Sequence, residues 1–174
     1  WSPGGADFSI AAWVKYDGPT DTADYRPIFG NNQNTPMLGY HPASNYWISF
    51  IQQTSPSDSE NWLWYPSDVN LRADDGQWHY VAVTFGDATT QEVNLYVDGV
   101  SITSVSSGTG NPKTMTMDNT AGNGAWTKIG KDYASGGSTS YWDGQIASMM
   151  TWTTVLSHDQ VIQNYNYFKH RFGK

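Results

Sequence analysis

The acidic residues are the first place to look for catalytic chemistry in this chain of 174 residues. A retaining glycosidase needs two carboxyl groups about 5–5.5 Å apart, one as nucleophile and one as acid. The only two glutamates, Glu60 and Glu92, are far apart in the sequence. The adjacent Asp74 and Asp75 would face opposite ways on a strand, so a turn is the better interpretation. We therefore predict no catalytic residues and no enzymatic activity, and a hydrolase is the least favoured alternative.

Metal binding has equally little support. The histidines are isolated from one another and belong to no nucleophile motif; they are His41, His79, His158 and His170. We interpret His79 as a core or cross-strand partner. Two groups of oxygen donors could bind calcium, and they are Asp17, Asp21 and Asp24, and Asp118 with Asn119. Neither group has EF-hand spacing, so turn formation stays open as the alternative and no metal ligand is predicted. The chain contains no cysteine, which excludes disulfides and thiolate sites.

Aromatic residues are the stronger lead, because the chain has nine Trp and eleven Tyr. Sugar rings stack on aromatic faces while their hydroxyl groups bond to polar side chains. Two sets are candidate ligand-binding residues. On successive expected strands these are Trp47, Trp62, Trp64 and Tyr65, and at strand ends or loops they are Tyr40, His41, Tyr133, Tyr141 and Trp142. Core packing and a protein interface both remain open alternatives for Trp47, Trp62 and Trp64.

Composition limits the classes of partner. The net charge of -7, with only nine Lys and Arg, argues against nucleic acid, which needs clustered basic residues. No apolar run reaches the roughly 20 residues needed to span a bilayer, so membrane insertion is not expected. The length suits a single domain over residues 1–174. Because the chain opens at Trp1 without Met, we expect it to be a fragment of a longer polypeptide.

Alternating apolar and polar residues predict strands that would position these side chains. The clearest pair is 77–86 and 93–99, and Asp98-Gly99 supplies a two-residue hairpin turn back into 100–102. Shorter candidates share the pattern, and they are 7–16, 26–30, 36–40, 46–52, 61–65, 126–131 and 145–152, with a possible edge strand at Met115 and Met117. Short strands joined by Gly, Asn and Ser turns indicate an all-β sandwich.

One helix is predicted, over residues 157–170. Ser157 and Gln160 have the spacing of a capping box, and Leu156 can pack against Val161 as a hydrophobic staple. The apolar stripe contains Val161, Tyr165 and Phe168. We expect this helix to pack across a sheet edge or onto a neighbouring domain.

Several sequence blocks together resemble the laminin-G-like branch of the concanavalin A-like lectin/glucanase superfamily. The blocks are FSIAAWVK at 8–15, QWHYVAVT at 77–84, LYVDG at 95–99, KIG at 128–130, WDGQI at 142–146 and VLS at 155–157. The resemblance implies a jelly roll of two antiparallel sheets with ligands bound at the concave face or rim loops. It also places Trp13, Trp78 and Trp152 at core positions of the family. Hydrolases of the superfamily carry a Glu-x-Asp-x-x-Glu motif, which is absent here.

Two departures from the family pattern bear on function. Relatives have an additional strand before the first block, so here it would lie outside this fragment or come from another segment. Relatives also have an acidic pair where Ala147 and Ser148 stand, which puts the structural calcium site of the family in doubt. Residues 163–173 resemble the end of such domains in structural proteins of tailed phages, which implies a virion surface.

The sequence thus predicts a non-catalytic recognition or decoration domain that binds a glycan or cell-surface polysaccharide on a virion or in another extracellular setting. Neighbouring structural proteins are expected partners. The alternative is a purely structural domain that packs on a capsid or tail protein. Calcium stays open as a ligand.

Overall fold

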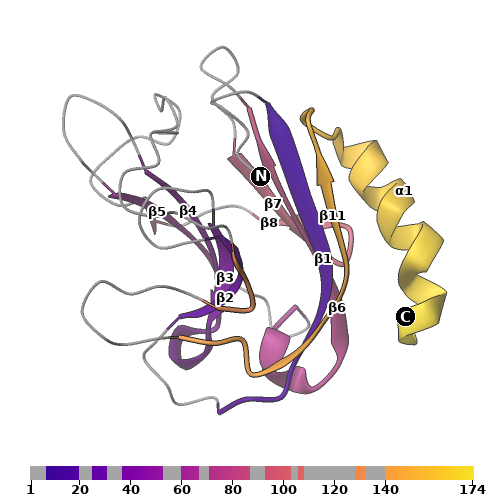
Figure 1. Cartoon of the computed structure of the whole chain (residues 1–174). Coiled ribbons are helices and arrows are strands. Elements are labelled where there is room, and N and C mark those ends of the chain that lie inside the picture. Colours follow the sequence, from indigo (N-terminus) through magenta and orange to yellow (C-terminus); the bar gives the residue numbers. More distant parts are fainter. Residues whose placement is uncertain are drawn as a thin grey trace.

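The computed structural model of the chain describes residues 7–19, 25–30, 37–52, 60–66, 71–86, 93–102, 106–107, 128–131 and 140–174. These residues form two antiparallel sheets stacked face to face, with a helix outside one of them (Figure 1). The two-sheet, all-β prediction is confirmed. The expected edge strand at Met115 and Met117 and the aromatic Tyr133 lie outside the described residues.

The first sheet has five strands in the order β11-β1-β6-β7-β8. Its strands are β1 (Phe8–Tyr16), β6 (Trp78–Phe85), β7 (Val93–Val97), β8 (Val100–Ile102) and β11 (Gly144–Trp152). The second sheet has six strands in the order β10-β2-β3-β4-β5-β9. Its strands are β2 (Arg26–Gly30), β3 (Met37–His41), β4 (Tyr46–Gln52), β5 (Glu60–Pro66), β9 (Ser106–Ser107) and β10 (Lys128–Ile129).

The β7–β8 hairpin forms as its sequence predicts. Asp98 and Gly99 have φ angles of 50° and 82°, which is the pair of positive angles that a two-residue type I′ turn requires. Val97 pairs with Val100 directly across the turn. Local chemistry therefore fixes the register of this hairpin.

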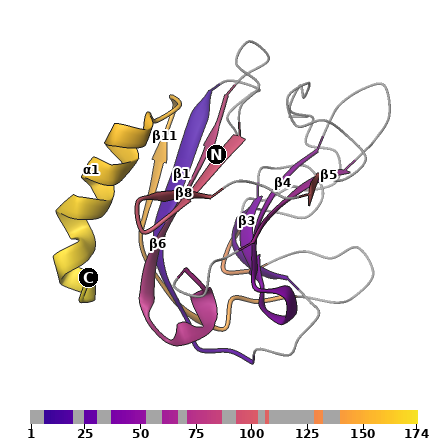
Figure 2. The ribbon, with the colours of Figure 1, turned by 180° about the vertical axis from the view of Figure 1, so that it is seen from behind.

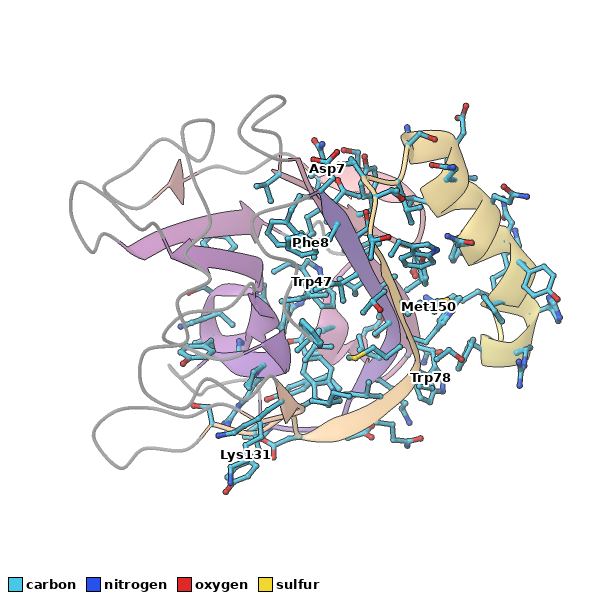
Figure 3. All side chains as sticks on the ribbon, turned by 45° about the horizontal axis from the view of Figure 1, so that its top comes forward. Asp7, Phe8, Trp47, Trp78, Lys131 and Met150 are labelled. Carbon is cyan, nitrogen blue, oxygen red and sulfur yellow. The ribbon has the colours of Figure 1, made fainter. Side chains whose placement is uncertain are left out.

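The main core lies between the two sheets, and alternate residues of the central strands supply it. Phe8, Ile10 and Val83 from the first sheet are fully buried there with Leu38 and Trp47 from the second. Figure 3 shows Phe8 and Trp47 in this layer between the sheets. This is the arrangement that period-two patterning produces when one strand face points toward a partner sheet.

The opposite face of the first sheet is also buried, because the helix α1 (His158–Phe168) lies against it (Figure 2). Ser157 caps the helix: its Oγ accepts a hydrogen bond from the Gln160 amide at 3.3 Å, and the Ser157 amide donates to Oε1 of Gln160 at 2.8 Å. The predicted capping box is confirmed. The predicted docking position is wrong, because α1 packs on the outer sheet face rather than across an edge.

The chain continues past α1 as a 3₁₀ turn, Lys169–Phe172, that completes this second core. Phe172 stacks on Trp13 with ring centroids 4.2 Å apart and planes inclined by 12°. Tyr165 stacks on the same indole at 5.8 Å. Within the described residues, no helix has the length and apolar character needed to cross a membrane.

Candidate functional site

Among the predicted ligand-binding residues whose side chains the structure describes, Tyr141 has the most exposed ring, and two short segments hold it at one end of the sandwich. Lys131 forms a bridge with Tyr141 beyond the end of β10. The Gly130 amide donates to the Ile28 carbonyl at 2.9 Å, and the Trp142 amide donates to the Gly130 carbonyl at 2.9 Å. We call Lys131, Tyr141, Trp142 and Asp143 the Tyr141 rim. These backbone bonds attach the rim to β2 and so to the second sheet.

Tyr141 and its neighbour Lys131 face solvent. The Tyr141 side chain is 48% exposed, and the Lys131 ammonium lies 5.2 Å from its ring centroid. Figure 3 shows Lys131 at the end of the molecule away from α1. The nearby Ile129 is 59% exposed. Because the ammonium lies over one face of the ring, the other face is the one that can take an apolar ring face of a ligand, while the cation can bind hydroxyl or carboxylate groups.

Trp142 is a supporting residue rather than a ligand-binding one, which corrects its predicted role. Its side chain is buried, and its Nε1–H lies within hydrogen-bonding distance of the Lys15 and Gln145 carbonyls, at 3.2 and 3.3 Å. Its indole also makes an edge-to-face contact with Tyr16, with centroids 5.3 Å apart. The buried indole therefore fixes the backbone that presents Tyr141.

An ion pair and a backbone hydrogen bond hold Asp143 of the rim in place. Arg26 on β2 lies 3.5 Å from the Asp143 carboxylate, and the Asp17 amide donates to the Asp143 carbonyl at 2.8 Å. Gly18 sits so close to Asp143 and Tyr16 that an added Cβ would clash with both. This close packing makes the rim a preformed surface.

Two other predicted ligand-binding residues, Tyr40 and Trp47, belong to the core, which corrects their assignment as ligand-binding residues and, for Trp47, matches the core alternative that the sequence left open. Both are fully buried. The Trp47 Nε1–H donates to the Leu71 carbonyl at 2.9 Å, and the Tyr40 hydroxyl lies 3.1 Å from Oδ1 of Asn45 and 3.3 Å from Oδ1 of Asp74. Because neither ring reaches solvent, neither can stack on a ligand in this conformation.

The remaining candidates divide by position. Trp62 and Trp64 pair with Phe50 and Ile48, while Tyr65 pairs with the buried Trp47. Since alternate positions of a strand belong to opposite faces, Trp62 and Trp64 occupy the positions opposite to those that line the core. The sequence had grouped Trp47 with Trp62 and Trp64, but the backbone register separates them. His41 is partly buried at the end of β3.

The sequence predicted only part of a buried cluster of ionisable side chains around His79. Nδ1 of His79 lies 2.9 Å from the Asp98 carboxylate, and Nε2 lies 3.0 Å from the carboxylate of Asp75. Lys174 approaches the same Asp98 carboxylate at 3.1 Å. The cross-strand interpretation of His79 is correct, but its two carboxylate partners come from turns that the sequence explained by backbone shape alone.

The electrostatics of this cluster indicate a structural role. Burial alone would raise the pKa of the Asp98 carboxyl, but the hydrogen bonds from His79 and the Tyr80 amide and the charge of Lys174 bring that pKa below its usual value. His79 is fully buried and both of its ring nitrogens face carboxylates. The cluster joins the turn before β6, the β7–β8 turn and the C-terminal segment.

Comparison with known protein families identifies the fold. The laminin G model of the concanavalin A-like lectin/glucanases superfamily matches residues 2–162. The chain belongs to this superfamily. A comparison with curated protein sequences gives no significant match.

Solved structures of lectin-like proteins share the fold at low sequence identity. A pentraxin from Limulus polyphemus is 16% identical with a TM-score of 0.55, and the match covers 90% of this chain and 68% of the pentraxin. A candidate carbohydrate-binding protein from Bacteroides ovatus is 17% identical with a TM-score of 0.62, over 91% of this chain and 40% of that one.

Botulinum neurotoxin type C, whose cell entry depends upon interaction with two ganglioside molecules, is 15% identical with a TM-score of 0.60. That match covers 93% of this chain but 36% of the toxin chain. The chain thus spans well under half of two of these three proteins, and the likeness to them concerns the fold.

The described residues of this superfamily member do not fit the calcium site that the resemblance implies. Ala147 and Ser148 on β11 supply no carboxylate. Among the described positions, no group of three or more His, Cys, Asp or Glu is arranged to hold a metal ion. Asp17 pairs with Lys15 at 3.3 Å. The other oxygen donors lie outside the described residues, and they are Asp21, Asp24, Asp118 and Asn119.

Proposed function

We propose that this chain is a non-catalytic recognition domain that binds glycans at the Tyr141 rim, with Trp62 and Trp64 as further stacking platforms. The observation that carries the proposal is the half-exposed Tyr141 ring on a backbone held by hydrogen bonds and backed by the buried Trp142. A preformed aromatic surface binds a sugar face with little loss of conformational entropy. Lys131 adds a hydrogen-bond donor beside the ring.

The absence of catalysis is part of the proposal. Asp143 is the carboxylate that the described rim contains, and Arg26 pairs with it. A single carboxylate committed to an arginine does not supply the nucleophile and acid that glycoside hydrolysis uses. The structurally similar proteins named above include carbohydrate-binding and ganglioside-dependent examples, which supports recognition rather than turnover.

A glycan array probed with the chain and matched variants tests this function, with and without calcium. We expect Tyr141→Ala and the double variant Trp62→Ala/Trp64→Ala each to weaken binding by about tenfold or more, since stacking on an aromatic ring supplies about 1–3 kcal/mol. Tyr167→Ala is the control, because Tyr167 is 70% exposed on α1, outside the rim. Circular dichroism should confirm that every variant keeps its fold.

If no glycan binds under either condition, the second candidate function, a structural packing domain, takes precedence. The full burial of Trp47 favours that candidate, because it removes one expected platform residue from the surface. Exposed apolar side chains such as Ile129, at 59%, would then serve protein contacts. A similar structure in complex with a protein supports such contacts. It is the binding domain of botulinum neurotoxin DC in complex with rat synaptotagmin II, which is 14% identical with a TM-score of 0.61 over 95% of this chain and 37% of that one.

We further propose that the domain is displayed on a virion or another extracellular surface. The resemblance of residues 163–173 to phage structural proteins supports this placement. Detecting the chain by mass spectrometry in purified particles, and its loss after mild surface proteolysis, would test it.

A further inference from the structure

Two adjacent aspartates in the 3₁₀ turn Ala73–Asp75 contact the two sheets separately. Oδ1 of Asp74 lies 3.3 Å from the Tyr40 hydroxyl on β3 of the second sheet. Oδ1 of Asp75 lies 3.0 Å from Nε2 of His79 on β6 of the first sheet. The Asp74 side chain is 2% exposed, whereas that of Asp75 is 34% exposed. The turn therefore joins the sheets, and the Asp75 contact is the one that water can replace.

The ring of His79 has a carboxylate at each of its two nitrogens. Nδ1 lies 2.9 Å from Oδ2 of Asp98, and Nε2 faces Asp75. The ring itself is fully buried. An ionised carboxylate accepts hydrogen bonds and donates none, while a neutral imidazole has one N–H group. Only a ring with a proton on both nitrogens can donate to both carboxylates at once.

The other groups bound to these two carboxylates are donors. Oδ1 of Asp98 accepts a hydrogen bond from the Tyr80 amide at 2.9 Å, and Oδ2 accepts one from the Lys174 ammonium at 3.1 Å. Oδ1 of Asp75 accepts one from the Gln77 amide at 2.8 Å. Such surroundings favour the ionised form of a carboxyl group. The ring is then the group that must supply a proton to each side.

Charge balance favours the same state of the ring. The charged groups around it are Asp75 from the turn, Asp98 from the β7–β8 turn and Lys174 from the C-terminal segment. On α1, burial and the charge of Asp98 raise the pKa of the Tyr165 hydroxyl, so this group stays neutral. Two carboxylates and one ammonium leave an excess negative charge around a neutral ring, and a second ring proton cancels it. An uncompensated charge in a buried site is costly.

We propose that His79 is a pH-sensitive switch that holds the turn Ala73–Asp75 against β6 only while both of its ring nitrogens carry a proton. Since a ring proton is lost as the pH rises, the turn is released in that direction. The contribution of the Asp98 carboxylate changes the opposite way, because it is lost as the pH falls through the lowered pKa of that group. The two transitions are therefore separate, and neither requires glycan binding at the Tyr141 rim.

Exposure decides which contact breaks. A ring with one N–H keeps it directed at Asp98, because that carboxylate is the less exposed of the two and also binds Lys174. Asp75 turns toward water instead. The hydrogen bond from the Tyr40 hydroxyl to Asp74 does not involve the ring. The turn therefore stays attached to the second sheet and is released from the first.

Nuclear magnetic resonance of the whole chain with ¹⁵N-labelled histidine tests the protonation of the ring. The His79 signals are assigned from their own backbone, so no substitution is needed. Spectra from about pH 5 upward should show two protonated nitrogens and then loss of the Nε2 proton. The backbone amide signals of residues 73–77 should shift with the same midpoint.

Three results would overturn the proposal. A ring with an unprotonated nitrogen throughout would mean that Asp75 carries the proton. A ring that keeps both protons at every pH at which the chain is folded would mean that there is no switch. Turn amides that do not follow the ring would mean that the proton does not hold the turn.

Asp75→Asn isolates the contact that senses the proton. A carboxamide accepts from a protonated Nε2 or donates to an unprotonated one, so this variant pairs with either state of the ring. In the wild type the equilibrium constant for unfolding should rise by about tenfold as the ring loses its proton, because a hydrogen bond between charged groups is lost. In Asp75→Asn the rise should be absent.

Asp17→Asn is the matched control. Asp17 is also a partly exposed aspartate in an ion pair, with Lys15, and it lies outside the cluster around His79. Its substitution should leave the wild-type rise with pH intact. An equal rise in Asp75→Asn and in the wild type would mean that Asp75 does not sense the proton, and the proposal would fail.

Discussion

Two stacked aromatic pairs lie on opposite faces of the five-stranded sheet, and they are held in different ways. On the inner face Phe8 and Phe85 stack at 4.4 Å between the two sheets, and both are fully buried. On the outer face Trp13 and Phe172 stack at 4.2 Å, and Phe172 is partly exposed. The inner pair joins strands from the middle of the fold. The outer pair depends on the C-terminal segment that follows α1.

Similar ring geometry therefore occurs in two different settings, one fully buried and one partly exposed, and we expect the two pairs to differ in stability. Both rings of the inner pair are fully buried between the two sheets, so this pair can separate only when the sandwich opens. The outer pair can separate if residues after α1 detach. The salt bridge from Lys174 to Asp98 is the contact that joins this segment to the cluster around His79.

The largest effect is expected from Phe85→Ala. Removing a fully buried ring leaves a cavity between the sheets and should lower the free energy of unfolding by about 3–5 kcal/mol. Guanidinium denaturation followed by tryptophan fluorescence measures this loss. Val100→Ala on the exposed edge strand β8 is the control and should change stability by less than about 0.5 kcal/mol. A similar loss in both variants would contradict the inner-core assignment.

Asp98→Asn should rank second, with a loss of about 1.5–3 kcal/mol at pH 7, because it removes the carboxylate that is hydrogen-bonded to His79 and Lys174. The pKa of Asp98 is lowered in the folded chain, so its contribution is present above the unfolded value of about 3.9. That contribution is lost as the pH falls through the lower folded value. Denaturation curves from pH 7 to acid should therefore show wild type and variant converging.

The control for this pH dependence is Asp143→Asn. The Asp143 side chain is 42% exposed in its pair with Arg26, and exposed pairs contribute about 0–1 kcal/mol. If the difference in free energy of unfolding between wild type and Asp98→Asn stays constant as the pH falls, the Asp98 carboxylate is not what stabilises the cluster.

Phe172→Ala tests the outer pair and should cost about 1–2 kcal/mol, less than the inner variant, since a partly exposed ring loses less buried apolar area. Hydrogen exchange should show α1 amides opening before those of β1 and β6. Tyr167→Ala, at an exposed position on the same helix, should neither lower the free energy of unfolding nor change the order in which the amides open. Equal losses for Phe172→Ala and Phe85→Ala would show that the two faces unfold as one unit.

Ser157→Ala should give the smallest of these effects, about 1 kcal/mol, because it removes the side chain that caps α1. Thermal unfolding of this variant is compared with that of Thr153→Ala, which removes an exposed hydroxyl ahead of the helix. The difference in melting temperature measures the contribution of the cap. If the two variants melt together, docking on Trp13 rather than the cap decides helix stability.

The elements that form from neighbouring residues were predictable from the sequence. Alternation over residues 78–85 sets a strand because backbone geometry alone places successive side chains on opposite faces. The hairpin turn at Asp98-Gly99 and the capping box of Ser157 and Gln160 each form within four consecutive residues. Both therefore follow from the local sequence. The superfamily resemblance rests on the same local blocks.

Burial and long-range pairing were decided only by the tertiary structure. Alternation separates two faces of β4 but does not say which one meets the other sheet, so Trp47 was predicted as a candidate surface residue and lies in the core. Trp142 and Tyr141 are adjacent and chemically alike, yet hydrogen bonding to a distant strand buries one and leaves the other on the rim. The Asp98 carboxylate pairs with both His79 and Lys174, which also joins distant positions. Such contacts depend on how the two sheets and the C-terminal helix stack, and no local pattern encodes that arrangement.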